Sequence, residues 1–175
     1  MGREIRRVPP NWQHPKKEQL RLVNGRYGYV EDYQPLYKRD FAEAMEEWYS
    51  EWKKWEAGER DPDAPASMRY HEWDCGPPDP DYYQHGIKPE DCTWFQVYET
   101  VSEGTPVSPP FETAEELAQY LAVNGDFWDQ LRVKEGRQPS PAGWGIENAR
   151  KFVGSGWAPS AALIGGEMKT ARDGI

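Results

Sequence analysis

Histidine and cysteine side chains gather between positions 71 and 92, where their types suggest a metal centre or a nucleophilic catalytic pair. The candidates are His71, Cys75, His85 and Cys92, with Asp74 and Asp79 between them. Structural zinc sites usually pair their ligands closely, as C-x₂₋₄-C, and this chain has no such pair of cysteines. A Cys–His nucleophile needs a surrounding motif, and none is present. We therefore interpret these residues as surface histidines and reduced thiols, and expect no metal and no cofactor.

Carboxylates are the other groups with catalytic potential, because paired carboxylates act in glycosidases and nucleases. They are so abundant in the middle of the chain that no pair stands out from the rest. The sequence also lacks the phosphate-binding, dinucleotide-binding, nucleophile-elbow and H-E-x-x-H motifs. We therefore predict that the protein is not an enzyme. A small metal-dependent hydrolase built on the histidines and cysteines above stays open as an alternative.

The charge pattern favours a protein partner over nucleic acid. The formal net charge is -9, yet the first 26 residues are basic. Between Glu72 and Leu131 acidic residues dominate, and Lys88 is the sole Lys or Arg. Such a segment repels nucleic acid and attracts cationic surfaces, so we expect no direct nucleic-acid binding. A partner that itself binds nucleic acid would fit, with mimicry of DNA phosphates as one form of recognition.

The composition predicts a small, loop-rich single domain spanning residues 1–175. The chain is only 37% hydrophobic but contains nine Trp and ten Tyr, which supply large side chains for burial. Sixteen Pro and sixteen Gly interrupt long regular elements. We predict the α+β class, with short antiparallel hairpins and two to three helices. No segment has the roughly 20 apolar residues of a membrane span, and the start shows no export signal, so we expect no membrane association.

Local patterns predict most of the elements. Residues 1–17 are rich in Pro and Arg and are expected as a basic extended arm. Asn24-Gly25 between alternating apolar residues predicts a hairpin, as does Gly165-Gly166. Residues 59–92 read as a long aromatic loop. The segment from Thr93 to Val101 has the composition of a strand covered on both faces.

Three helices are expected. The clearest runs from Asp40 to Gly58. Its apolar stripe favours core packing, with a docking face as the alternative; the stripe consists of Phe41, Met45, Trp48, Trp52 and Trp55. Thr113 and Glu116 form a T-x-x-E capping box that opens a second helix ending at Asn124-Gly125. A short third helix is expected near 146–153.

Three passages resemble a widespread set of uncharacterised proteins from tailed phages and prophages. They are REIRRVPPNWQHP at the start, WFQVYETVSEGTPVSPPFETAEELAQYLAVNG in the middle and SGWAPSAALIGGEMK near the end. The middle passage is the most specific of the three. The resemblance implies a phage gene product acting in the host cytoplasm, and it brings no biochemical activity with it.

The turn within the middle passage is the predicted interaction site, because prolines preorganise its polar residues for contact. The alternative is a purely structural turn. The acidic residues that follow complete the candidate surface, whose members are Glu99, Ser102, Glu103, Gly104, Thr105, Pro106, Ser108, Glu112, Glu115 and Glu116.

We expect a non-enzymatic phage accessory protein that binds a host protein, with an anti-defence inhibitor of the anti-CRISPR type as one form. Two alternatives stay open, a virion structural or assembly component and the small metal-dependent hydrolase. The oligomeric state is not predicted.

Overall fold

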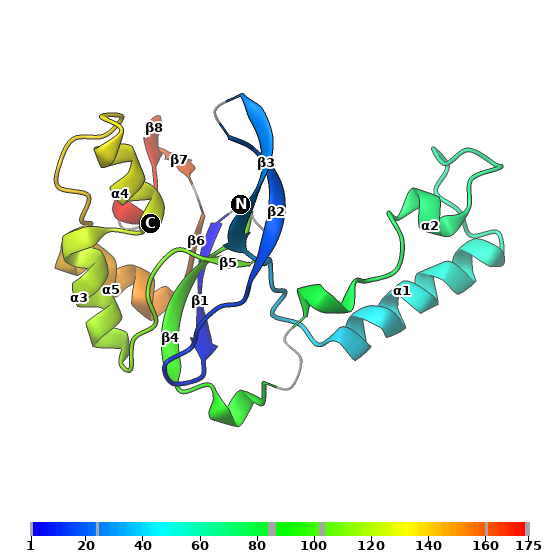
Figure 1. Cartoon of the computed structure of the whole chain (residues 1–175), viewed down its shortest axis with the longest axis horizontal. Helices are drawn as coiled ribbons and strands as arrows, with labels where there is room; N and C mark the ends of the chain where they lie inside the picture. Colours follow the sequence, from blue (N-terminus) through cyan, green and yellow to red (C-terminus); the bar gives the residue numbers. More distant parts are fainter. Residues whose placement is uncertain (1, 24, 84–86, 102–103, 160, 174–175) are drawn as a thin grey trace. The chain divides into compact units, whose positions relative to one another are not determined.

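The computed structural model describes residues 2–23, 25–83, 87–101, 104–159 and 161–173. Its elements mix helices with short antiparallel sheets, so the predicted α+β class is confirmed (Figure 1). The internal contacts divide the chain into two compact units. Residues 1–35 and 87–175 form the first unit, and residues 36–86 form the second.

The first unit is built on a four-stranded antiparallel sheet in the order β5-β4-β1-β6. Its strands are β1 (Gly2–Val8), β4 (Trp94–Glu99), β5 (Thr105–Pro106) and β6 (Trp157–Pro159). The predicted strand at 93–101 is therefore present as β4. It is covered on both sides, because its neighbours Val97 and Tyr98 point to opposite faces and are both fully buried.

The basic start of the chain is an interior strand of this sheet. Residues 1–17 were expected as an extended arm, and their first part is extended, but β1 pairs with β4 on one side and β6 on the other. Arg3 lies opposite Glu99 in the register, and Val8 lies opposite Trp94. Both Arg3 and Arg6 are buried in spite of their charge. Ion pairs to Asp126 and Glu4 allow this, because buried cations require an anionic partner.

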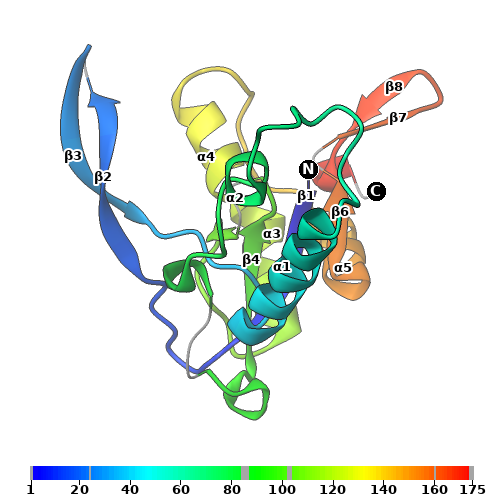
Figure 2. The same ribbon diagram turned by 90° about the vertical axis from the view of Figure 1, so that its right-hand side faces the viewer.

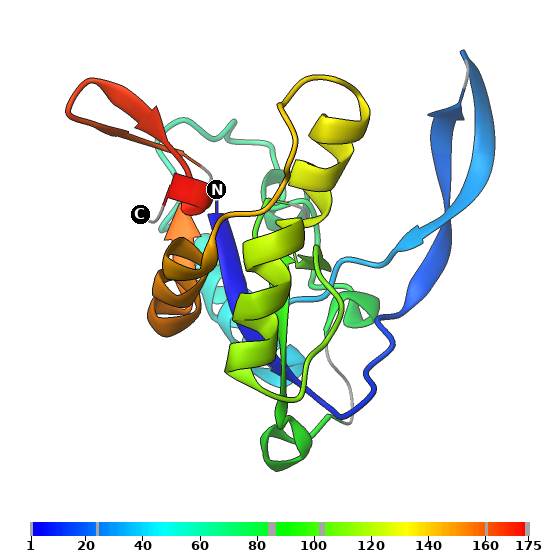
Figure 3. The same ribbon diagram turned by 90° about the vertical axis from the view of Figure 1, so that its left-hand side faces the viewer.

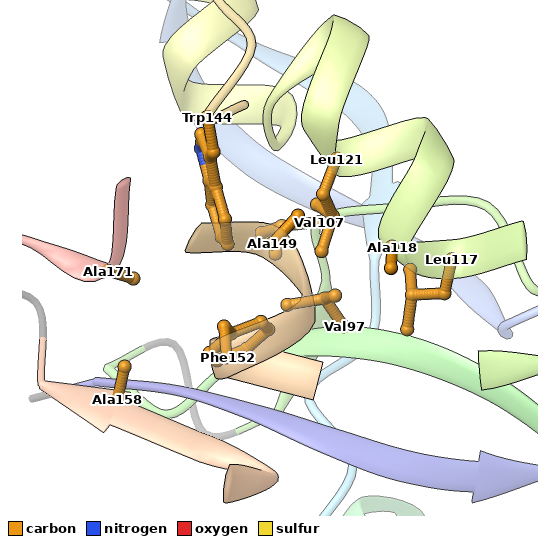
Figure 4. Packing of buried hydrophobic residues seen from close by; sticks show 10 residues of the cluster. All are labelled: Val97, Val107, Leu117, Ala118, Leu121, Trp144, Ala149, Phe152, Ala158 and Ala171. Carbon is orange, nitrogen blue, oxygen red and sulfur yellow. The ribbon is translucent and has the colours of Figure 1, made fainter. Parts of the chain in front are cut away.

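Helices α3 (Ala114–Asn124) and α5 (Ile146–Ser155) cover one face of the sheet, and Figure 3 shows α3 lying along β1 and β4. Figure 4 shows the resulting core, in which Val97 of β4 lies between Leu117 and Phe152. The predicted capping box is formed: the amide of Glu116 donates to Thr113 Oγ1 over 3.1 Å, and the Thr113 amide donates back to the Glu116 carboxylate over 3.0 Å.

The predicted hairpins are both present in this unit. They are β2 (Lys16–Val23) with β3 (Arg26–Tyr33), and β7 (Ala162–Ile164) with β8 (Glu167–Lys169). Gly165 and Gly166 have φ angles of 61° and 84°, which two-residue turns of this kind require and which glycine adopts without strain. Figures 2 and 3 show the hairpins projecting at opposite ends of the unit.

Further short helices lie where no local pattern predicted them. Helix α4 (Phe127–Lys134) follows α3 after a turn at Gly125, and its N-cap Asp126 accepts a hydrogen bond from the Asp129 amide over 2.9 Å. The single-turn helices η2 (Pro89–Asp91) and η3 (Ala171–Asp173) complete this unit.

The second unit pairs helix α1 (Phe41–Glu56) with the segment predicted as a loop. Asp40 caps α1 as predicted, accepting a hydrogen bond from the Ala42 amide over 2.6 Å. The segment contains α2 (Tyr70–Trp73) and η1 (Pro80–Tyr82). Tyr70 lies 5.3 Å from the Trp48 ring and 5.7 Å from the Trp55 ring, measured between centroids. The apolar stripe of α1 therefore packs within its own unit, although Trp55 is its one fully buried member among these residues.

Within the described ranges, no helix combines the length and the apolar character that crossing a membrane requires.

Candidate functional site

The most unusual surface of the first unit is one face of the β2–β3 hairpin. Leu20 pairs with Tyr29 and Leu22 with Tyr27 across the two strands. Residues at alternate positions share a face, so these four side chains form one block. Their exposed fractions are 56%, 73%, 63% and 76% in that order. We call this block the outer hairpin face.

The polarity of this hairpin is reversed. An amphipathic antiparallel pair normally buries its apolar face and exposes its polar one. Here the alternate positions Lys17, Gln19, Val30 and Asp32 are half-buried, while the leucines and tyrosines point to solvent. A contiguous exposed apolar block of this kind is typical of a surface that binds another macromolecule.

Two adjoining cavities of about 680 and 550 Å³ lie in the first unit. Residues that line both are Tyr33, Pro106, Val107 and Phe127. The first cavity is walled mainly by aromatic, proline and amide side chains, among them Trp12, Tyr120, Pro109, Gln96 and Gln130. The second contains a charged pair, in which Arg21 donates to Asp32 over 2.8 Å.

Tyr98 is the centre of a buried hydrogen-bond network beside the first cavity. Its hydroxyl accepts from Trp12 Nε1 over 3.1 Å and donates to Gln96 Oε1 over 3.0 Å. The Gln96 amide in turn donates to the carbonyl of Ser108 over 2.8 Å. Burial raises the pKa of Tyr98 to about 12, so the hydroxyl keeps its proton at neutral pH. The network ties the proline-rich start of the chain to β4 and to the segment after β5.

His14 completes this network through both ring nitrogens. Its Nε2 lies 2.6 Å from the Gln34 carbonyl, and its Nδ1 lies 3.1 Å from the Tyr98 hydroxyl. A carbonyl only accepts, so Nε2 carries a proton. Burial lowers the pKa of His14, the Gln34 carbonyl opposes this, and the Arg6 charge lowers it further. In the neutral ring Nδ1 is an acceptor. It therefore competes with Gln96 Oε1 for the one proton that the Tyr98 hydroxyl can donate.

Some of the predicted interaction residues line the cavities. Glu99 and Thr105 line the second cavity, Ser108 lines the first, and Pro106 lines both. Gly104 is buried with a φ of 95°. The remaining two residues of the predicted turn, Ser102 and Glu103, lie outside the described residues.

The same turn is held by internal hydrogen bonds. Ser108 Oγ accepts from the Val97 amide over 2.9 Å and donates to the Pro109 carbonyl over 2.9 Å. Glu99 accepts from Trp128 Nε1 over 3.0 Å. These polar groups satisfy the protein itself, which agrees with the structural alternative for the turn.

The acidic residues that follow lie apart from both cavities. Glu112, Glu115 and Glu116 are exposed around the start of α3. Glu116 belongs to the capping box, and Glu115 pairs with Arg150 over 2.6 Å. The hydrogen bonds from Arg150 lower the pKa of Glu115. Their arrangement is that of a solvated helix surface with two of the three carboxylates engaged.

The sequence-predicted metal candidates do not form a described cluster. His71 and Cys75 are exposed in the second unit, whereas Cys92 is half-buried in the first and has a pKa raised by burial. His85 lies outside the described residues. Among the positions that the structure describes, no three His, Cys, Asp or Glu side chains are placed to hold a metal ion.

Sequence reasoning missed the outer hairpin face and the His14–Tyr98 network. The alternation of Leu20, Leu22, Tyr27 and Tyr29 was visible and predicted the hairpin, but alternation does not say which face is buried. The W-x-H-P run around His14 offered a weak signal. No protein-family model, curated protein or solved structure matches the chain.

Proposed function

We propose that this chain is a phage-encoded, non-enzymatic accessory protein that binds a host protein through the outer hairpin face. The observation that carries the proposal is the exposure of Leu20, Leu22, Tyr27 and Tyr29 on one side of β2–β3. The mechanism is occlusion: the hairpin covers a surface that the partner needs. Inhibition of a host defence system is the form of this function that the phage-like passages favour.

The energetics favour a protein surface as the partner. Full burial of a large apolar side chain stabilises a contact by roughly 1.5–3 kcal/mol, so four such residues are enough to anchor an interface. Tyr is enriched at interface hot spots because its ring buries a large area at little entropic cost. The four residues of the outer hairpin face are uncharged and the exposed pair Glu18 and Glu31 continues the same side. The chain as a whole carries -9, and both facts disfavour nucleic acid as the direct ligand.

A pull-down from host lysate with two matched variants tests the proposal. Leu22→Ser with Tyr27→Ser removes half of the face, and both residues are exposed, so the fold is expected to persist. Val123→Ser removes a residue that is 70% exposed on α3 and serves as the control. We expect the wild type and the control to retain one host protein in near-stoichiometric amount, and the double variant to lose it. Retention by all three chains would reject the outer hairpin face as the site.

A virion assembly component is the second candidate. The observation that favours it is that β2 and β3 pair only with each other among the described residues, so neither strand has a second strand partner there. Open edges are templates for pairing with another chain, including a second copy. Quantitative detection of the protein in purified particles, in multiple copies, would favour this reading over host-protein binding.

A further inference from the structure

A small cavity in the first unit is lined by three guanidinium groups from separate elements. Arg3 comes from β1, Arg132 from α4 and Arg172 from η3. The cavity has a volume of about 90 Å³. We propose that this arginine pocket, defined by Arg3, Arg132 and Arg172, binds a phosphate-like oxyanion. The inference is independent of the host-protein proposal.

The burial of Arg3 supports the binding of an anion in this pocket. Its side chain is buried, with 7% of the residue exposed, yet its protein contact is the ion pair from Nε to Asp126. A guanidinium has five N–H donors, and a buried charge is stable only when those donors have acceptors. Among the described residues the bond to Asp126 is the one side-chain hydrogen bond of Arg3, and its other guanidinium nitrogens reach the solvent of the pocket, where a ligand can contact them.

The neighbouring carboxylates are already engaged. Asp126 Oδ1 accepts from the Asp129 amide over 2.9 Å. Asp129 Oδ2 accepts from Trp144 Nε1 over 2.6 Å, and its Oδ1 from Arg132 Nη1 over 3.1 Å. Figure 4 shows Trp144 at the end of the core near Ala171, the residue before Arg172. These contacts orient both carboxylates and leave few lone pairs for further guanidinium donors.

Arg172 adds a positive charge that these carboxylates do not balance. Its one hydrogen bond among the described residues runs from Nη2 to the Pro141 carbonyl over 3.2 Å, and it forms no ion pair there. Asp173 is adjacent, but its carboxylate accepts from the amide and hydroxyl of Thr170. Arg3 and Arg132 are paired with Asp126 and Asp129, so among the described residues the pocket has one positive charge in excess, that of Arg172.

Size and geometry select the ligand class. A cavity volume of about 10–15 Å³ is enough to hold one water molecule. The arginine pocket, at about 90 Å³, is several times larger and accommodates a tetrahedral oxyanion. It is too small for a nucleotide. Planar guanidinium forks match the oxygen spacing of phosphate and form paired, charge-assisted hydrogen bonds with it. Water would fill the same space but would leave the charge of Arg172 without an anionic partner among the described residues.

Thermal unfolding of the full chain with increasing inorganic phosphate is the test, with sodium chloride at matched ionic strength as the reference. We expect a saturable rise of the unfolding midpoint with phosphate and no comparable rise with chloride, because a ligand that binds the folded state stabilises it. Arg172→Gln and Arg132→Gln are each expected to weaken the fitted phosphate affinity by about tenfold, the usual scale for losing one charged hydrogen-bonding group.

Arg150→Gln is the control variant, because Arg150 is an exposed arginine that pairs with Glu115 outside the pocket. Its phosphate affinity should equal that of the wild type. The proposal fails if phosphate and chloride act alike on the wild type. It also fails if saturable phosphate binding is unchanged in Arg172→Gln and Arg132→Gln. Calorimetric titration of the wild type at 25 °C gives the same decision without heating.

Discussion

At the scale of single residues, Tyr98 joins segments that are distant in the sequence. Its hydroxyl contacts Trp12 and His14, which lie more than 80 positions away, and Gln96 passes the connection to Ser108. Arg6 lies with its guanidinium carbon 4.5 Å from the Tyr98 ring centroid. Tyr98 thus holds the segment around Trp12 and His14 against β4 and fixes this part of the wall of the first cavity.

The pKa of His14 makes the stability of this arrangement pH-dependent. Burial lowers the pKa below the 6.5 of the unfolded chain, so the unfolded state takes up the proton first on acidification. The stability that neutral His14 contributes is therefore complete above pH 6.5 and declines as the pH falls from there through the lower pKa of the folded state. Urea unfolding at pH 7.5 and 5.5 measures this loss, which His14→Gln should reduce. The exposed His71, changed to Gln, is the control and should leave the loss unaltered. An equal loss in both variants would show that His14 plays no part.

At the scale of elements, the sequence predicted what local chemistry determines. The Asp40 cap, the Thr113–Glu116 capping box and the glycine turns act over a few residues, so they were readable without any tertiary information. The central position of β1 in the sheet could not be predicted from the sequence, because its partner strands lie about 90 and 155 positions away. Helix α4 was missed as well, since it is only eight residues long, although the hydrogen bonds between Asp126 and Asp129 that cap it are local.

In the candidate site, too, the features set by neighbouring residues were predictable from the sequence, and those set by distant segments were not. Placement of Glu99, Thr105, Pro106 and Ser108 near one another was predictable from their closeness in sequence. The outward direction of Leu22 and Tyr27 depends on how the hairpin meets the rest of its unit, which no local pattern encodes.

Two glycines test how closely the elements pack: Gly143 in the connection before α5, and Gly154 inside α5. A Cβ at Gly143 would meet the carbonyl oxygens of Ala122 and Val123, the second at 2.5 Å, because this segment crosses the end of α3. Gly154, inside α5, has no heavy atom within 4 Å of the same position. We expect Gly143→Ala to destabilise the fold by about 1–3 kcal/mol through overpacking, and Gly154→Ala to stabilise it by roughly 0.5–1 kcal/mol through helix propensity. Chemical denaturation of both variants gives the two free energies, and equal effects would contradict the close crossing.

At the scale of the whole molecule, the second unit is an insertion between β3 and β4 of the first. The buried core cluster runs from Val97 to Ala171 and draws on first-unit residues alone. Replacing residues 36–86 by a flexible Gly/Ser linker of about 20 residues should therefore leave a cooperatively unfolding first unit, since loop closure depends only weakly on length. Circular dichroism with thermal melting tests this. A molten or unfolded product would mean that the second unit is required for the first to fold.

The position of β1 has a consequence for biosynthesis. Strand β1 lies between partners that a ribosome adds much later, at positions 94–99 and 157–159. During elongation its backbone amides and carbonyls have no native neighbours, and the sheet closes only when nearly the whole described chain has emerged. A nascent chain of this kind depends on chaperone protection for longer than one that folds strand by strand.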